Sequence, residues 1–253
     1  MCIRDSADIS RQLHHDIAKG YMGGFLIRKL SNTPQGSAVF SDGPEMAPLT
    51  SQVPIHPMYR DPVRLVLDDF ESNPSLTTTS AGLPAAATHV AQAEASFDST
   101  PMTLYHKTDG YVAAFGPGTA GLWAVLLDPL LTGLDATPFT HFSVKFAQRR
   151  NSPVNVPGQA QDVTLGLMDA DLDLALVELS DFGTIPWPIS HPGGGPFGPS
   201  FPIKSVLRTT RVPFTAFTAA NPLLDLDRLL YAGWLSDQTP QGELEFDDFE
   251  LTR

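Results

Sequence analysis

The hydrophobic pattern divides the chain into two unlike parts. Between residues 9 and 30 apolar side chains recur every three or four positions, which predicts one amphipathic helix. Residues 31–62 are rich in proline and small polar residues and show little periodicity, so we expect an irregular linker there. From Val63 onward the period changes to two, the spacing of half-buried β-strands.

About ten short alternating runs follow in this second part, with turn residues between them. The strongest are 63–67, 142–146, 163–167, 172–176, 206–214, 229–235 and 244–251, and weaker ones lie near 103–106, 111–115 and 122–127. Many short strands with turns between them are typical of an all-β sandwich or barrel. We therefore expect residues 61–253 to form one two-sheet antiparallel sandwich with its first and last strands close together. A Pro- and Gly-rich stretch, 183–202, predicts a long loop.

The first and last strands share an irregularity. In the opening strand the apolar phase changes at Asp68–Asp69, and in the closing strand it changes at Asp247–Asp248. A strict period of two would turn Phe70, Phe249 and Leu251 toward solvent. A β-bulge shifts the phase by one residue, and it would return these side chains to the core.

Composition narrows the possible functions. The chain has 16 Lys and Arg against 28 Asp and Glu, a formal charge of −12, so it would repel nucleic acid phosphates. No apolar run reaches the length of a membrane-spanning helix. The single cysteine, Cys2, excludes thiolate zinc sites. We expect neither a nucleic acid partner nor a membrane span.

Few residues carry chemistry. The sequence contains no G-x-S-x-G nucleophile elbow, no Gly-rich phosphate loop, no H-E-x-x-H and no C-x-x-C, and we assign no catalytic residue. Trp187 lies between Pro186 and Pro188 in the long loop, with His191 nearby. A tryptophan held by prolines offers a stiff stacking surface, so Trp187 and His191 are the candidate ligand-binding pair. The alternative is that Trp187 plugs an open end of the sandwich. Trp123 and Trp234 lie in apolar strands and are expected in the core.

Three segments carry a family resemblance. They are Asp68-Asp69-Phe70-Glu71, the late strand Arg211-Val212-Pro213-Phe214 with Phe217, and the terminal Asp247-Asp248-Phe249-Glu250-Leu251. This layout resembles the galactose-binding-like jelly rolls that serve as carbohydrate-binding modules and accessory domains of secreted bacterial enzymes. The resemblance implies a jelly-roll sandwich, an extracellular location and a carbohydrate or polymer surface as partner.

The acidic pairs lead to a metal hypothesis. Clustered carboxylates repel one another unless a cation lies between them, and Ca²⁺ takes six to eight oxygen ligands. The jelly-roll resemblance also implies a structural calcium between the two terminal strands. We therefore predict a Ca²⁺ site formed by Glu71 and Asp247, helped by Asp69 or Asp248. The alternative is that both pairs are solvated strand ends.

The N-terminal part suggests a truncated protein. The opening Met1–Ser6 resembles translated sequencing-adapter read-through, so residues 1–6 are interpreted as an artefact. The segment His14-His15-Asp16-Ile17-Ala18-Lys19-Gly20-Tyr21-Met22-Gly23-Gly24-Phe25-Leu26 resembles the C-terminal helix of bacterial α/β-hydrolases of the esterase and lipase type. Residues 7–60 would then be the end of an upstream catalytic domain whose nucleophile is missing here.

Two functions remain open from the sequence. The first is a non-catalytic accessory sandwich at the C-terminus of a truncated secreted serine hydrolase, itself without activity. The second is a carbohydrate-binding module of a glycosidase or surface protein, or a purely structural sandwich.

Overall fold

The computed structural model describes residues 12, 15–20, 22–23, 26, 63–72, 75–96, 109–149, 152–188, 205 and 207–253. The chain divides into two units, Met1–Arg60 and Asp61–Arg253, and each is treated by itself. In the first unit every described residue is helical, in agreement with the apolar period, and Ile17 is buried. Within the described residues no helix is long and apolar enough to cross a membrane.

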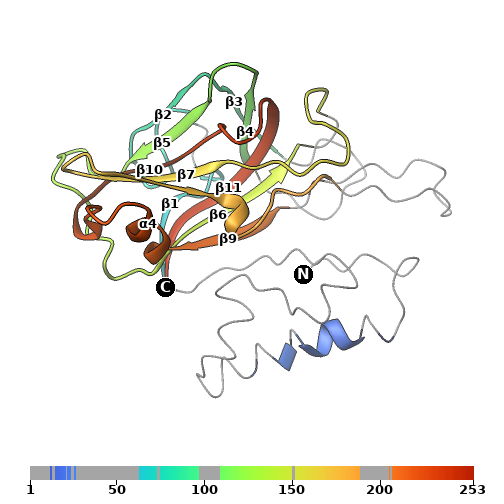
Figure 1. The fold of residues 1–253 in the computed structure, drawn as a ribbon, viewed down its shortest axis with the longest axis horizontal. Helices are drawn as coiled ribbons and strands as arrows, with labels where there is room; N and C mark the ends of the chain where they lie inside the picture. The colour runs from blue at the N-terminus through green and yellow to red at the C-terminus, as the bar shows by residue number, and fades with distance from the viewer. Residues whose placement is uncertain are drawn as a thin grey trace. The chain divides into compact units, whose positions relative to one another are not determined.

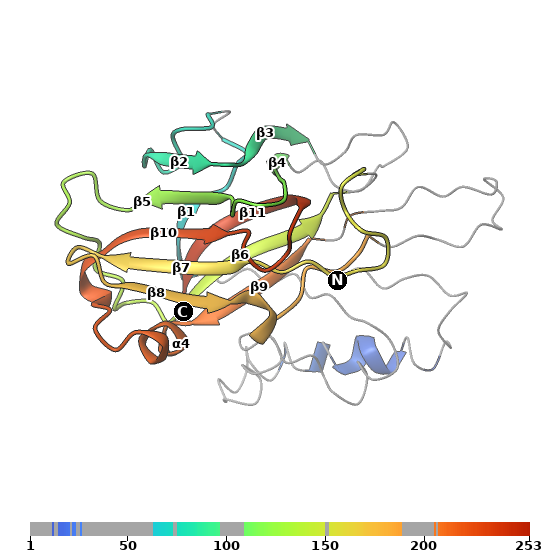
Figure 2. The same ribbon diagram turned by 45° about the horizontal axis from the view of Figure 1, so that its top comes forward.

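The second unit is a sandwich of two antiparallel sheets, seen as two layers in Figures 1 and 2. One sheet has the order β3-β4-β11-β6-β9, with β1 also paired to β11. Its strands are β1 (Arg64–Asp68), β3 (Ala91–Ser96), β4 (Asp109–Phe115), β6 (His141–Gln148), β9 (Arg208–Pro213) and β11 (Gly242–Thr252). The other sheet has the order β2-β5-β10-β7-β8. Its strands are β2 (Ala85–Thr88), β5 (Leu122–Leu126), β7 (Thr164–Asp169), β8 (Leu174–Glu178) and β10 (Leu229–Leu235).

Strand β11 is the centre of the six-stranded sheet and changes partner along its length. On one edge its first half pairs with β4, as far as Phe246 opposite Tyr111. Its second half pairs on that edge with β1, from Phe249 opposite Asp68 to Thr252 opposite Arg64. The first and last strands therefore lie side by side, as predicted. Asp247 and Asp248 occupy the gap between the two partners.

Both predicted β-bulges are present at the acidic pairs. The β1–β11 register shifts between Val66 and Asp68, and the β11–β6 register shifts between Asp247 and Glu250. Asp248 has a positive φ of 44°, the local backbone turn that absorbs the extra residue. Phe249 and Leu251 are fully buried as a result, although a strict period of two would have turned them to solvent.

The core between the sheets is built around aromatic rings. Trp123 and Trp234 are buried, as expected from their apolar strands. Phe246 lies 5.3 Å from Trp123 and 5.5 Å from Trp234, measured between ring centroids, in edge-on geometry that favours ring pairs. Contributions from both sheets to one aromatic cluster fix the spacing of the two layers.

Several elements differ from the sequence pattern. The strands β2 and β3 consist largely of alanine, a residue depleted in strands, and the pattern did not predict them. Leu172 precedes β8 in a turn with a φ of 71°, so that strand begins at Leu174. The run 206–214 ends at Pro213, where the short helix α4 (Phe214–Ala220) begins. Single-turn 3₁₀ helices at Leu179–Asp181 and Leu226–Arg228 complete the fold. The strand predicted near 103–106 lies outside the described residues.

Candidate functional site: buried charges and an amide cluster

Asp68 holds the loop after β1 in place. Its Oδ1 accepts hydrogen bonds from the backbone N–H of Phe70 at 3.0 Å and of Ser80 at 3.1 Å. Phe70 adopts a φ of 52° there and turns into the core, 5.2 Å from the ring of Phe246. Burial raises the pKa of Asp68, and the two backbone hydrogen bonds oppose that effect. The role of Asp68 is therefore to stabilise the backbone turn that buries Phe70.

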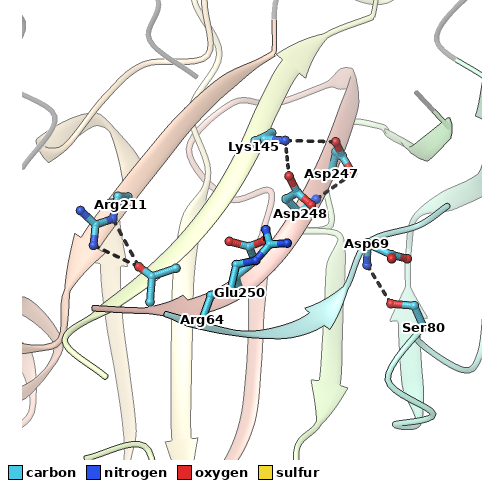
Figure 3. Close-up of polar contacts among 9 residues, drawn as sticks. Arg64, Asp69, Ser80, Lys145, Arg211, Asp247, Asp248 and Glu250 are labelled. Carbon is cyan, nitrogen blue, oxygen red and sulfur yellow. Dashed lines mark hydrogen bonds and ion pairs between the residues drawn. The ribbon is translucent and has the colours of Figure 1, made fainter. Parts of the chain in front are cut away.

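A strict period of two would place Asp69 in the core. In the structure, its side chain does not point there. It is half-buried, and its Oδ1 accepts hydrogen bonds from the Ser72 hydroxyl at 2.8 Å and from the backbone N–H groups of Glu71 and Ser72. Its backbone N–H donates to the Ser80 hydroxyl at 2.9 Å (Figure 3). Burial alone would raise the pKa of Asp69, but these hydrogen bonds lower it below its usual value.

The second acidic pair surrounds a lysine. Lys145 on β6 lies opposite Asp247 in the register, and its Nζ is 3.5 Å from Asp247 Oδ2. The same Nζ donates to Asp248 Oδ2, so one ammonium serves two carboxylates (Figure 3). All three residues are at most 9% exposed. Burial and the charge of Asp248 raise the pKa of Asp247 to about 7, with a smaller contribution from Glu71, whereas Lys145 lowers it.

Two further polar contacts continue along the same outer face of the six-stranded sheet. Arg64 Nη1 donates to Glu250 Oε1 at 2.5 Å, which joins β1 to β11. Arg211 on β9 donates to the Thr252 hydroxyl at 3.1 Å and also to the backbone carbonyl of Arg253. Glu250, Thr252 and Arg211 are each at most 5% exposed. We call the row Arg64, Lys145, Arg211, Asp247, Asp248 and Glu250 the charged face (Figure 3).

Most carboxylates of the predicted Ca²⁺ site already have other partners. Within the described residues no group of three or more acidic, histidine or cysteine side chains gathers in metal-binding geometry. Asp69 Oδ1 is already engaged by three donors, and Lys145 supplies a positive charge at Asp247 and Asp248. The four residues therefore do not form a ready oxygen cage, and calcium binding by Glu71, Asp69, Asp247 and Asp248 stays a prediction.

The described segment that carries Trp187 is attached near the C-terminal end of β6. Ile185 forms an isolated bridge with Gln161, with hydrogen bonds in both directions between their backbones. Gln148 Nε2, at the end of β6, donates to the Ile185 carbonyl at 2.9 Å and to the Gln159 carbonyl at 2.8 Å. Trp187 follows two residues later and is half-buried. His191 lies outside the described residues.

Three side-chain amides lie close to the Ile185 bridge. Asn155 Oδ1 accepts hydrogen bonds from Gln161 Nε2 at 2.7 Å and from the Glu243 backbone N–H at 2.7 Å. Gln148 and Gln161 are 1% and 4% exposed, yet the Oε1 atom of each accepts no hydrogen bond from any described group. Most buried amide oxygens do find a donor. These three residues, Gln148, Gln161 and Asn155, form the amide cluster.

Sequence reasoning missed both Lys145 and the amide cluster, although each left a signal. Phe142, Val144 and Phe146 set the inward phase of β6, and Gln148 continues it as a polar residue at a core position. A buried glutamine at a strand end indicates a polar network. Lys145 is the only charged residue within an otherwise apolar run, and its pairing with Asp247 depends on the strand order.

Comparisons with known proteins concern the sandwich. No family model matches the chain, and no curated protein matches it either. A family 11 carbohydrate-binding module from Clostridium thermocellum, solved with a β-1,3-1,4-mixed-linked tetrasaccharide, has 15% identity and a TM-score of 0.44, over 75% of this chain and 94% of that one.

Two other solved structures show comparable likeness. A family 30 carbohydrate-binding module of a cellulosomal cellulase of Clostridium thermocellum has 9% identity and a TM-score of 0.47, over 74% of this chain and 97% of that one. An arabinose-bound α-L-arabinofuranosidase has 14% identity and a TM-score of 0.41, over 76% of this chain and 26% of that one. The strand order and the antiparallel pairing of the two sheets define the fold class, an all-β jelly-roll sandwich.

Proposed function

We propose that this chain is a non-catalytic carbohydrate-binding module. The observation that carries the proposal is the half-buried Trp187, which lies in a segment whose backbone Gln148 and Gln161 anchor at Ile185. A sugar ring can stack on an indole face. The sequence resemblance to carbohydrate-binding jelly rolls points in the same direction.

The two parts of this site have separate roles. Gln148, at the end of β6, and Gln161, just before β7, hold the backbone at Ile185, so the described start of the loop is positioned before any ligand binds. A pre-positioned loop reduces the ordering cost of binding. Trp187 would then supply the contact area for a sugar ring.

Affinity electrophoresis of the full chain tests the proposal. Native gels would contain β-1,3-1,4-glucan, xylan or agarose, with a gel lacking polysaccharide as reference. We expect retardation by at least one polysaccharide, loss of retardation in Trp187→Ala and its retention in Trp187→Phe, which keeps an aromatic ring. Leu130→Ala, an exposed change in another loop, is the matched control. Equal retardation of wild type and Trp187→Ala would move the site elsewhere, and migration unaffected by any polysaccharide would remove the proposed function.

The position of this module in a longer protein is a further proposal. We infer from the sequence resemblance of residues 14–26 that an α/β-hydrolase domain precedes the sandwich in a secreted protein. The chain itself lacks a nucleophile elbow, so we expect no turnover of short-chain nitrophenyl esters. The genomic sequence upstream of Ala7 tests the context: a G-x-S-x-G followed by Asp and His supports the hydrolase, whereas a glycosidase or adhesin sequence contradicts it.

A further inference from the structure

The outer face of the five-stranded sheet is almost free of charge. In β2, β5, β10 and β7 every outward position is Leu, Ala, Gly, Thr, Met or Tyr, and the one charged outward residue is Glu178 at the end of the edge strand β8. An antiparallel sheet with one solvated face normally alternates apolar and polar residues. We call this surface, presented by all five strands, the apolar face.

Leucines gather at one part of this surface. Gly166 and Gly233 are neighbours in the register at the middle of the sheet, and leucine side chains pack over Gly166. A Cβ added at Gly166 would lie 3.2 Å from Leu176 Cδ2, 3.8 Å from Leu174 Cδ1 and 3.9 Å from Leu235 Cδ1. Leu174 and Leu176 are nevertheless 49% and 41% exposed. Contiguous exposed apolar surface of this kind marks an interaction site more often than scattered single residues do.

The surroundings of the apolar face are strongly acidic. The four segments that build the sheet and its turns, 84–90, 120–133, 161–182 and 222–238, contain ten acidic residues and one basic residue, Arg228. They therefore carry nine of the twelve net negative charges of the chain. Arg228 is itself paired with Asp171 at 2.8 Å, in the turn between β7 and β8. Glu178 and Asp237 stand at the opposite end of the strands, so acids border the leucines at both ends.

We propose that the apolar face binds a cationic amphipathic peptide segment of a partner protein, with leucine-like side chains against Leu174, Leu176 and Leu235 and Lys or Arg side chains toward the acidic borders. Three outward positions along a strand span about 13 Å, enough for one helix about 10 Å wide laid across the strands. Charge complementarity selects this occupant. A second copy of the chain would bring the same acids face to face, and an anionic surface would be repelled.

Binding of two synthetic peptides tests the proposal. The first is a labelled 18-residue helix with leucines at i, i+3, i+4 and i+7 and lysines on the flanking positions, and the second has glutamate in place of each lysine. Fluorescence anisotropy with the full chain should show binding of the lysine peptide that weakens as salt is raised, and at least tenfold weaker binding of the glutamate peptide. The double variant Leu174→Gln with Leu176→Gln should lose at least tenfold in affinity.

A matched variant and a second measurement complete the test. Val63→Gln changes an exposed residue that precedes β1, on the other sheet, and should leave the affinity unchanged. Thermal melting confirms that each variant is folded. The proposal is overturned by absence of binding, by equal binding of both peptides, or by full affinity in the double variant. Sedimentation velocity that shows dimers of the wild type, lost in the double variant, would overturn it in favour of self-association.

Discussion

The two outer faces of this sandwich reverse the usual arrangement. The charged face of the six-stranded sheet has Lys145, Asp247 and Glu250 almost completely buried, each with an opposite charge within reach. The apolar face of the five-stranded sheet leaves Leu174 and Leu176 nearly half exposed. Polar side chains usually remain in water and leucines usually leave it.

The difference indicates which outer face contributes to the stability of the fold and which is available for binding. Buried charges are tolerated only when they are paired, and removal of one partner leaves a costly isolated ion. Exposed leucines contribute little to folding, so their retention points to an interaction instead. Changes on the charged face should therefore affect stability, whereas changes on the apolar face should affect binding alone.

The largest expected effect follows from removing the lysine. Lys145→Met leaves two buried carboxylates without a cation and should lower the free energy of unfolding by about 3–5 kcal/mol. Arg149→Met removes a pair with Glu243 whose arginine is 40% exposed, and it should cost no more than about 1 kcal/mol. Urea denaturation at pH 8 measures both. Equal losses of unfolding free energy in the two variants would show that burial does not raise the contribution of the charged face to stability.

The second-largest expected effect on stability is that of bound Ca²⁺. If Glu71, Asp69, Asp247 and Asp248 bind Ca²⁺, a hundredfold excess over the dissociation constant should stabilise the fold by about 2.7 kcal/mol. Thermal melting with EDTA and with added Ca²⁺ should then differ in the wild type and coincide in Asp247→Ala. Identical wild-type curves in both conditions would leave Lys145 as the cation that serves these acids.

The raised pKa of Asp247 predicts a dependence on pH. Its folded value of about 7 exceeds the ordinary 3.8, so the folded state holds a proton that the unfolded state releases. Stability from this group is therefore fully present below pH 4 and is lost as pH rises toward 7, with a slope of at most about 1.4 kcal/mol per pH unit.

Asp247→Asn tests that dependence. Because asparagine does not titrate, the stability difference between variant and wild type, measured in EDTA, should grow in favour of the variant between pH 4 and 7 and stay level above. A difference that is constant with pH would contradict the raised pKa. Asp68, whose pKa is also raised, is unchanged in both proteins and cancels.

The smallest effect belongs to the apolar face. Leu176→Gln should change the free energy of unfolding by less than about 0.5 kcal/mol, because the side chain is already partly solvated. Leu167→Ala, in the buried row of β7, should cost about 2–5 kcal/mol in the same urea experiment. A large loss in Leu176→Gln would show that the exposed leucines stabilise the fold, and it would weaken the case for a binding role.

Local pattern was sufficient for much of this fold. The period of two predicted most strands of the sandwich and the burial of Trp123 and Trp234, and the matched acidic pairs pointed to the closeness of the first and last strands. The change of phase at both acidic pairs predicted the bulges, because two apolar runs out of step can share one core only if an extra residue lies between them. Alanine strands gave no such signal.

The sequence by itself therefore determined three features. They are the alternation of apolar and polar residues along the strands, the change of phase at the two acidic pairs, and the net negative charge of the chain. Only the tertiary structure decided which charges meet: Lys145 reaches Asp247 and Asp248 because β6 pairs with β11, a contact about one hundred residues apart in the chain. It also decided that Gln148 and Gln161 both bind the backbone of Ile185 and that the leucines of β8 face outward over Gly166. Such contacts depend on strand order and register, and these are set by the packing of the whole core rather than by any local run of residues.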